Sequence, residues 1–455
     1  MLLGAQIKNF LSFNQTGADN PISFSLLPGK VQNQKDHVYV SGKFKVLKFT
    51  SVFGANAAGK SNLVKSLRFI QLAVKGRWPK RYIDSYFKPE PENGKQPSFF
   101  EISILLDGTV YRYGFKMVLN KGQFVEEWLN ECKNLKSNKL VFARNTLDGF
   151  FKFDERFMKR GLEEKLNVYA GDVSTDGSVL LLTILNKNKD KLYEDFPVAH
   201  ILRDVYNWIT KELYIVLDET PISNYSYLIR QQSIGSAFEI LRHFRTGIRD
   251  YELVDVPLDK VLAELPIGLK NMLLETIAKN IEKLAKGKRT LEGISLRYNK
   301  NLFIISYNDF IDNTEQRMCK TIKFKHEKDN ILFDFWEESD GTIRLLDLLE
   351  ILIAGKQQTF LIDEFELRLH PNLTKEFVRL FLEYAKERNV QLIITTHETE
   401  LLDLDLVRRD EIQLLERQAN GSTRIIPLES KNVRFDKVIN KAYLKGLYGG
   451  TNLYE

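Results

Sequence analysis

The sequence predicts an α/β protein, and three stretches carry that prediction. "FKVLKFTSVFGANAAGKSN" joins a β-rich run to a glycine-rich loop and then to a helical pattern. "TFLIDEFE" and "VQLIITTHE" are short apolar runs that end in polar residues, with a helical pattern between them. Buried parallel strands are continuous apolar runs connected by helices, so the three stretches fit one parallel sheet.

The composition predicts a globular chain of two or three domains. Its 455 residues are 43% hydrophobic and 28% charged, which is ordinary for globular proteins. Cys132 and Cys319 match neither a disulfide framework nor a zinc spacing, which favours a reducing compartment. The N-terminus is a poor signal peptide, and the longest apolar run, "SVLLLTIL", is too short to span a bilayer. We therefore expect a cytoplasmic protein without a membrane partner.

The glycine-rich loop predicts a phosphate-binding site, because it fits G-x-x-x-x-G-K-S. In such a loop the backbone N–H groups surround phosphates, the lysine reaches the β and γ phosphates, and the serine hydroxyl holds magnesium. A helical pattern follows at once, so a helix N-terminus would point at the phosphates. The alternative is a glycine-rich turn without a ligand. The candidate nucleotide-binding residues here are Gly54, Asn56, Gly59, Lys60, Ser61 and Asn62.

A phosphate-binding loop that cleaves a nucleotide also needs an acid that holds magnesium and a group that activates water. The ends of two further predicted strands supply candidates for these groups. Asp363 and Glu364 follow an apolar run, where a magnesium-holding acid and a general base are expected. His397 ends the next apolar run, and its ring could donate to a γ phosphate. The alternatives are a strand that ends in a turn with two acids and a histidine with a purely structural role.

These motifs, in this order, resemble the ABC-type ATPases of the SMC, RecF and RecN kind. "IKNFLSF" resembles their opening strand, "FFEISILLDGTVYRYGFKM" their N-lobe β-meander, and "EESDGTIRLLDLLEIL" their signature segment. "LHP" and "NKAYLKGLYGG" resemble the stand-alone AAA family ATPases of bacterial phage-defence (abortive infection) operons.

The resemblance implies a fold, a cofactor and a mode of assembly. The fold would be an α/β ABC-type P-loop ATPase head with an N-lobe β-meander and an inserted helical arm. The cofactor would be ATP with Mg²⁺, which Ser61 and Asp363 would hold. In a homodimer or higher homo-oligomer, Ser339 and Gly341 would complete the nucleotide site of a neighbouring subunit. The alternative for the SDGT sequence is an ordinary helix N-cap.

Some family positions cannot be matched. The signature reads SDGT where transporter-type cassettes have SGGQ. Gln71 and Gln96 are weak candidates for the glutamine that senses magnesium, and no base-contacting residue is assigned.

The length between the loop and the signature predicts an insertion. We expect an ATPase N-lobe with P-loop and meander at residues 1–150, a helical arm at residues 151–290, and a C-lobe at residues 291–455 with the signature, the Asp-Glu strand and His397. The arm carries basic clusters, which fit either nucleic-acid contact or a solvated face. They comprise Lys187, Lys189, Lys191, Arg242, Arg245, Arg249, Lys283, Lys286, Lys288 and Arg289.

The functional expectation is an ATP hydrolase that works between subunits. It would act as a sensor or scaffold that controls a separate effector protein from the same operon, for example a nuclease, in anti-phage defence. The alternative is an SMC- or RecF-like DNA-binding ATPase in DNA repair. Asp403 and Asp405 form a D-x-D pair, but no separate domain follows them, so we do not expect a nuclease in this chain.

Overall fold

The computed structural model describes residues 1–15, 20–78, 80–134, 137–217, 225–229, 231–286, 293–299, 301–311, 317–326, 331–355, 357–431 and 439–448. These residues form two compact units. The first comprises Met1–Asp218, Gly355–Glu366 and Leu382–Glu455, and the second comprises Glu219–Ala354 and Leu367–Phe381. None of the described helices is long and apolar enough to cross a membrane.

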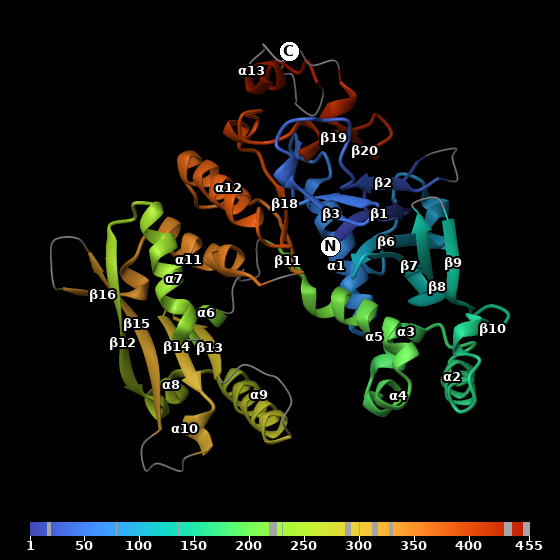
Figure 1. Ribbon diagram of the computed structural model, residues 1–455, viewed down its shortest axis with the longest axis horizontal. Helices are drawn as coiled ribbons and strands as arrows, with labels where there is room; N and C mark the ends of the chain where they lie inside the picture. Colours follow the sequence, from blue (N-terminus) through green and yellow to red (C-terminus); the bar gives the residue numbers. More distant parts are fainter. Residues whose placement is uncertain are drawn as a thin grey trace. The chain divides into compact units, whose positions relative to one another are not determined.

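The first unit contains a six-stranded sheet that carries the predicted loop (Figure 1). Its strands, in spatial order, are β11 (Leu213–Val216), β17 (Thr359–Ile362), β18 (Gln391–Thr395), β5 (Phe49–Gly54), β19 (Ile412–Arg417) and β20 (Thr423–Pro427). All neighbours are parallel except β19 and β20. The strands β5, β17 and β18 are buried throughout, as their apolar sequences predict.

A second sheet of the first unit has seven antiparallel strands, which include the predicted meander. Their spatial order is β10 (Phe150–Phe153), β9 (Ser137–Asn145), β8 (Gln123–Asn134), β7 (Thr109–Val118), β6 (Ser98–Leu106), β1 (Leu2–Lys8) and β2 (Ile22–Ser25). β3 (Val38–Ser41) and β4 (Phe44–Leu47) form a separate hairpin.

Helix α1 (Lys60–Val74) shares one hydrophobic core with both sheets. Its Phe69 ring lies 4.9 Å from the Phe100 ring of β6, measured between centroids, and α1 also shares this core with Val52 of β5. Burying aromatic side chains of this size contributes strongly to stability. The helix that follows the loop is therefore fixed to the body of the unit.

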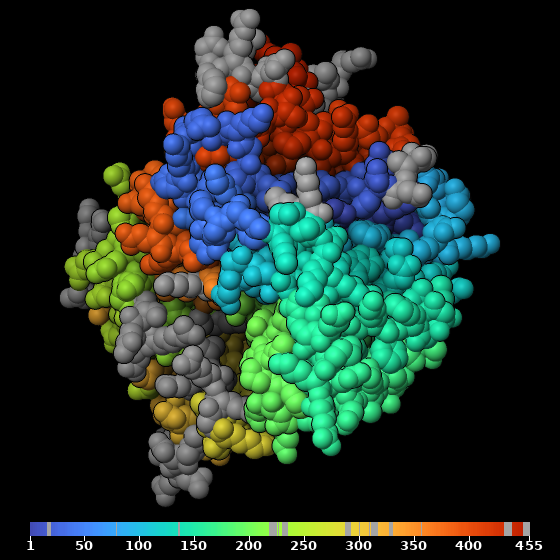
Figure 2. Space-filling view, turned by 45° about the vertical axis from the view of Figure 1, so that its right-hand side comes forward, coloured from blue at the N-terminus to red at the C-terminus, as the bar shows by residue number. Residues whose placement is uncertain are grey.

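The helices that follow the meander do not form a separate arm. They are α2 (Leu162–Gly171), α3 (Leu181–Asn186), α4 (Asp190–Asp195) and α5 (His200–Asn207), and their buried leucines belong to the core of the first unit. The buried Glu127 of β8 accepts hydrogen bonds from the backbone N–H groups of Leu181 (2.6 Å) and Leu182 (3.0 Å). In Figure 2 the meander and these helices, coloured teal to green, form one continuous surface.

The second unit combines helices with a further sheet. Its strands are β12 (Ile248–Pro257), β15 (Met318–His326), β14 (Asn301–Ser306) and β13 (Gly293–Tyr298), and β16 (Leu332–Asp334) pairs with β15. Its helices are α6 (Ser226–Ile229), α7 (Gln231–His243), α8 (Leu258–Glu264), α9 (Ile267–Ala285), α10 (Asn308–Ile311) and α11 (Asp340–Ile353). Helix α12 (Pro371–Ala385) begins in this unit and ends in the first, and α13 (Ile439–Leu444) belongs to the first.

The division into units differs from the predicted boundaries at residues 150 and 290. The second unit begins at residue 219, and its sheet and signature helix continue to residue 354. The physical reason is that the leucines of α2, α3 and α5 are buried against the first unit, which the helical pattern alone could not indicate. Lys288 and Arg289 of the basic clusters lie outside the described residues, as do Gly449 and Gly450 of the C-terminal motif.

Candidate nucleotide-binding site

The loop between β5 and α1 has the backbone geometry of an anion-binding turn. Ala57 and Gly59 have positive φ angles of 63° and 106°. A Cβ at Gly59 would lie 2.2 Å from Thr423 Oγ1, so only glycine fits this position. Helix α1 begins at the next residue, Lys60, and its free N–H groups face the loop.

Lys60 is only 6% exposed, and the loop itself holds its ammonium group. Its Nζ donates to Gly54 O (2.8 Å) and to Ala55 O (3.3 Å). Burial lowers the pKa of Lys60 to about 8, although Glu366, Asp363 and Glu364 oppose that shift. A phosphate at the loop would offer this cation an anionic partner in place of two carbonyl groups.

Thr395 orients the two acids at the carboxyl end of β17. Its Oγ1 donates to Asp363 Oδ1 (2.5 Å) and accepts a hydrogen bond from the Glu364 backbone N–H (2.9 Å). Glu364 adopts a left-handed backbone conformation, with φ of 46°, which is strained for a residue of this kind. Strain of this sort commonly accompanies a functional site.

Glu366 links the acidic strand end to His397, although the sequence motifs did not single it out. The His397 backbone N–H donates to Glu366 Oε1 (2.5 Å). Glu366 Oε2 is buried and has no hydrogen-bond partner among the described residues, which is unusual for a carboxylate oxygen. Desolvation and then the nearby Lys60 lower the pKa of His397, while Glu366 and Asp363 act in the opposite direction. His397 is therefore neutral near pH 7 and keeps one ring N–H for donation.

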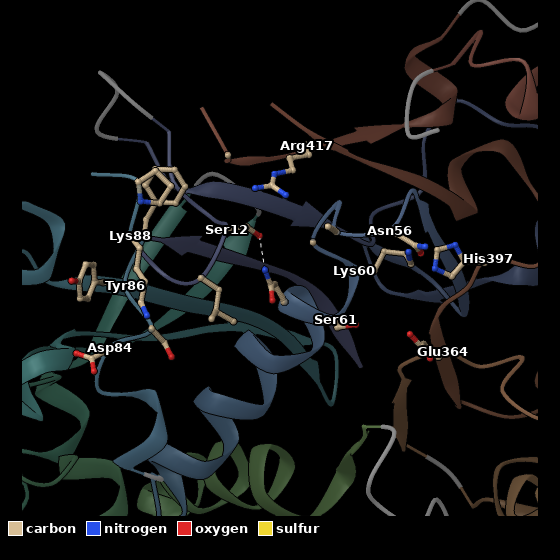
Figure 3. A pocket seen from close by; sticks show the side chains of 18 residues that line it. Ser12, Asn56, Lys60, Ser61, Asp84, Tyr86, Lys88, Glu364, His397 and Arg417 are labelled. Carbon is tan, nitrogen blue, oxygen red and sulfur yellow. Dashed lines mark hydrogen bonds between the residues drawn. The ribbon is translucent and has the colours of Figure 1, made fainter. Parts of the chain in front are cut away.

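These residues surround a pocket of about 600 Å³, a size suited to a small-molecule ligand. Figure 3 shows His397 beside Asn56 and Lys60, with Glu364 and Ser61 nearby. In the same view Asp84, Tyr86 and Lys88 lie at the end away from His397, and Arg417 is drawn between them and Lys60. The predicted residues that line it are Asn56, Gly59, Lys60, Ser61, Asn62, Glu364 and His397. Gly54 and the buried Asp363 do not line it, but Gly54 O accepts a hydrogen bond from the lining residue Lys60, and Asp363 directly precedes the lining residue Glu364.

The donor set fits magnesium with a nucleoside triphosphate. The Ser61 hydroxyl and the Asp363 carboxylate are hard oxygen ligands, which Mg²⁺ prefers. The loop amides, the lysine and the helix N-terminus complement phosphate charge. Among the described residues, no group of three or more His, Cys, Asp or Glu side chains could hold a metal without other ligands, as expected when the phosphates of a substrate and water supply the remaining positions.

A protein-family model matches residues 49–160 and 230–403, and its description reads "AAA domain, putative AbiEii toxin, Type IV TA system". The chain belongs to this family. The match confirms the predicted AAA family, and the P-loop at the end of the central strand β5 confirms the predicted α/β P-loop ATPase head. No curated protein matches the chain.

Solved structures with a distant likeness to this AAA-domain ATPase are heads of SMC proteins. An SMC head domain from Thermotoga maritima is 12% identical, with coverage of 94% of this chain and 98% of that one and a TM-score of 0.33. An Smc head from Pyrococcus furiosus, bound to the C-terminal domain of ScpA, is 15% identical, with coverage of 93% and 95% and a TM-score of 0.37. An SmcHead bound to the C-winged helix domain of ScpA is also 15% identical, with coverage of 93% and 96% and a TM-score of 0.40.

In this AAA-domain ATPase, Ser12 and Thr423 brace the P-loop from distant parts of the chain. Thr423 Oγ1 lies 2.9 Å from Ala58 O and 2.7 Å from Ser12 Oγ. Asn62 Nδ2 donates to the same Ser12 Oγ (2.8 Å), a bond drawn in Figure 3. Sequence reasoning missed Ser12 and Thr423 as site residues, because no local pattern marks a contact between residues 411 positions apart.

The signature segment lies in the second unit, at the start of α11. Ser339 is the N-cap, and its Oγ accepts a hydrogen bond from the Thr342 N–H (3.1 Å). A Cβ at Gly341 would lie 3.1 Å from Arg368 O, so this position favours a residue without a side chain. Neither Ser339 nor Gly341 lines the pocket. The local geometry is that of a capped helix, and a role in another copy's site is a proposal.

The remaining candidates from the sequence lie outside the pocket. Gln71 is buried, and its Nε2 donates to the backbone oxygens of Ile209 (3.0 Å) and Leu213 (2.5 Å), which gives it a structural role. Gln96 is exposed and does not line the pocket. Asp403 Oδ1 accepts the backbone N–H of Asp405 (3.0 Å), which is a local turn.

Proposed function

We propose that this AAA-domain ATPase binds and hydrolyses Mg-ATP in the pocket around Lys60. We also propose that its ATP state controls association between copies and, through it, a separate effector protein in anti-phage defence. The observation that carries the proposal is the convergence of Lys60, Glu364 and His397, from three separate segments, on one pocket. The family description, which names a toxin of a type IV toxin–antitoxin system, supports a place in a two-component defence operon.

Each residue has a role that follows from its chemistry. The ammonium of Lys60 and the N–H groups of the loop bind phosphate oxygens, and Ser61 and Asp363 hold the magnesium, which neutralises phosphate charge. Glu364 orients the attacking water and accepts its proton, because it lines the pocket as a carboxylate next to the metal-holding acid. The neutral His397 donates its ring N–H to the γ phosphate, since its lowered pKa leaves it uncharged but still a donor.

We propose that Ser339 and the backbone at Gly341 complete the site of a second copy. The support is local, because the capped N-terminus of α11 offers free N–H groups and partial positive charge to an anion. ATP bound in one copy would then hold two copies together, and hydrolysis would release them. An effector protein that binds only the associated copies would respond to ATP without a nucleotide site of its own.

The decisive experiment replaces Glu364 by Gln, which keeps the size of the side chain and removes its charge. We expect ATP binding to persist and phosphate release to fall by about a hundredfold to ten-thousandfold, the usual cost of losing a positioned base. Because bound ATP is not hydrolysed, chains associated through ATP should accumulate, and native mass measurement detects them. Glu400→Gln, an exposed carboxylate outside the pocket, is the matched control.

Two results would contradict different parts of the proposal. Near-normal phosphate release by Glu364→Gln would remove this residue from the catalytic role. Slow release with bound ATP, but without any change in association, would leave the ATPase and defeat the switch.

A further inference from the structure

The segment Asp334–Ser339, which precedes α11 in the second unit, is a rigid turn. The Asp334 N–H donates to Glu337 Oε2 (2.6 Å), and the Asp334 side chain completes a capping box with the backbone at Glu337. Phe335 is 1% exposed, and its ring packs against Phe324, with 6.2 Å between the centroids. Glu338 Oε1 lies 2.8 Å from His326 Nε2. The backbone on both sides of residue 336 is therefore fixed.

Trp336 is presented on this turn to solvent, with 51% of its surface exposed. The chain has four tryptophans, all within the described residues, and the other three are buried or half-buried. Trp336 is the largest of the exposed apolar side chains of the described residues, and covering its ring with a partner would remove that apolar area from water. Tryptophan is enriched among interface hot spots, because it offers a large contact area and loses little conformational entropy on binding.

The position of Trp336 indicates what covers it. It lies three residues before Ser339, so the two backbone positions are at most about 11 Å apart. A surface that brings Ser339 to another copy's nucleotide would therefore also bring Trp336 to that copy. This step rests on the proposed function.

Charge supports the same partner. The exposed residues around the turn include the acids Glu337 and Asp340, and Asp340 also lies 4.0 Å from Arg368. The pocket of the first unit is lined by the exposed cations Lys88 and Arg417, together with the acids Asp84 and Glu364. Glu337 on the turn of one copy can therefore pair with Lys88 or Arg417 at the pocket of another.

We propose that Trp336 packs on the pocket-bearing face of a second copy of this chain and is a main contact of the ATP-dependent assembly. It acts in binding and not in chemistry. Its removal therefore weakens association while each chain keeps its capacity to bind ATP.

The test uses the full-length chain with the Glu364→Gln change, which retains ATP. Trp336→Ala in this background should weaken ATP-dependent association at least tenfold, as measured by sedimentation or native mass at several protein concentrations. Met272→Ala is the matched control, because Met272 is an apolar side chain on α9 that is 60% exposed. It should leave association unchanged. ATP binding, measured with a fluorescent analogue at a protein concentration below that needed for association, should be equal in all three proteins.

Tryptophan fluorescence gives an independent readout. Addition of ATP to the Glu364→Gln parent should shift the emission of Trp336 to shorter wavelength as the ring leaves water, and Trp336→Phe should abolish that shift. Equal melting temperatures for the variants would show that the turn and fold are intact.

Three outcomes would overturn the inference. If the parent associates with ATP and Trp336→Ala associates equally strongly, the inference about Trp336 is wrong and the proposed switch stands. A parent that binds ATP but stays monomeric overturns it together with the proposed switch. If Trp336→Ala associates normally with itself but no longer binds the effector protein, the partner of Trp336 is the effector and not a second copy of this chain.

Discussion

At the scale of single residues, the proposed phosphate-binding residue Lys60 has an unusually low pKa for a lysine. Burial lowers its pKa to about 8, so without nucleotide it loses its proton at a pH where an exposed lysine keeps it. ATP binding favours the charged form, because the phosphates are anionic. ATP affinity should therefore be constant below that pKa and fall as the pH rises through it.

The first prediction is a fall in ATP affinity of about tenfold for each pH unit above the pKa of Lys60. Titration calorimetry in two buffers of different ionisation enthalpy should detect proton uptake on binding at pH 8.5. Lys60→Arg keeps its charge at every pH in this range, so whatever its affinity, the pH dependence should be flat. An equal slope in both proteins would show that another group titrates.

The candidate residues for the chemistry could be named from the sequence, and the residues that hold them in place in the structure could not. Lys60, Asp363 and Glu364 stand in short motifs, because phosphate and magnesium binding require particular residue types at fixed, short spacings along the chain. Glu366 and Thr395 act through hydrogen bonds to His397, Asp363 and Glu364 that only the folded sheet creates. Trp336 has no sequence signal, because its exposure depends on the fixed turn around it.

At the scale of elements, the P-loop depends on β20, a strand with no motif of its own. The hydroxyl of Thr423 lies against the loop carbonyl of Ala58 and against Ser12. Its removal would leave buried polar groups of the loop without a partner, at a cost of about 1–3 kcal/mol. We therefore expect Thr423 to contribute to ATP binding although it does not line the pocket.

The second prediction is that Thr423→Val, which keeps the shape and removes the hydroxyl, weakens ATP binding roughly tenfold or more. Thr423→Ser keeps the hydroxyl and should bind ATP nearly as the wild type does. Equilibrium binding of a fluorescent ATP analogue would measure both. If Val and Ser at this position bind equally, the brace has no role in shaping the loop.

Element prediction from the sequence succeeded where the apolar pattern was strong. The strands β17 and β18 appear where their apolar patterns predict them. β12, "IRDYELVDVP", was missed, because most of its side chains are exposed or half-buried and its pairing with β15 is a long-range contact. The run "FKVLKFTSVF" was predicted as one strand but divides at Lys48, whose Nζ donates to Ala385 O (2.5 Å).

At the scale of the whole molecule, the chain passes repeatedly between its two units. Residues 355–366, which carry Asp363 and Glu364, belong to the first unit and are joined at both ends to segments of the second. These two candidate catalytic acids are thus covalently connected to the unit that bears Ser339. This connectivity offers a direct route by which assembly and hydrolysis could affect each other.

The third prediction tests whether sites are shared between copies. Ser339→Arg should stop hydrolysis and spare ATP binding, and Lys60→Ala should lose both. A mixture of the two should regain about a quarter of the wild-type rate per chain, because half of randomly formed dimers are mixed and each has one intact site of two. Phosphate release is the measurement, and subunit exchange is checked with a tagged copy. A mixture that exchanges subunits but stays inactive would exclude sharing.

The order of strands in the six-stranded sheet also governs how the protein can be made. The central strand β5 is synthesised within the first 54 residues, yet its two neighbours, β18 and β19, come from residues 391–395 and 412–417. A ribosome that has released 390 residues has already produced the P-loop, but no strand lies on either side of it. Pairings this distant form slowly and leave apolar strands exposed to aggregation, so the nascent chain requires protection. Until residue 423 has emerged, the P-loop sequence is present but the pocket around it is incomplete, and we expect an unfinished chain not to bind ATP.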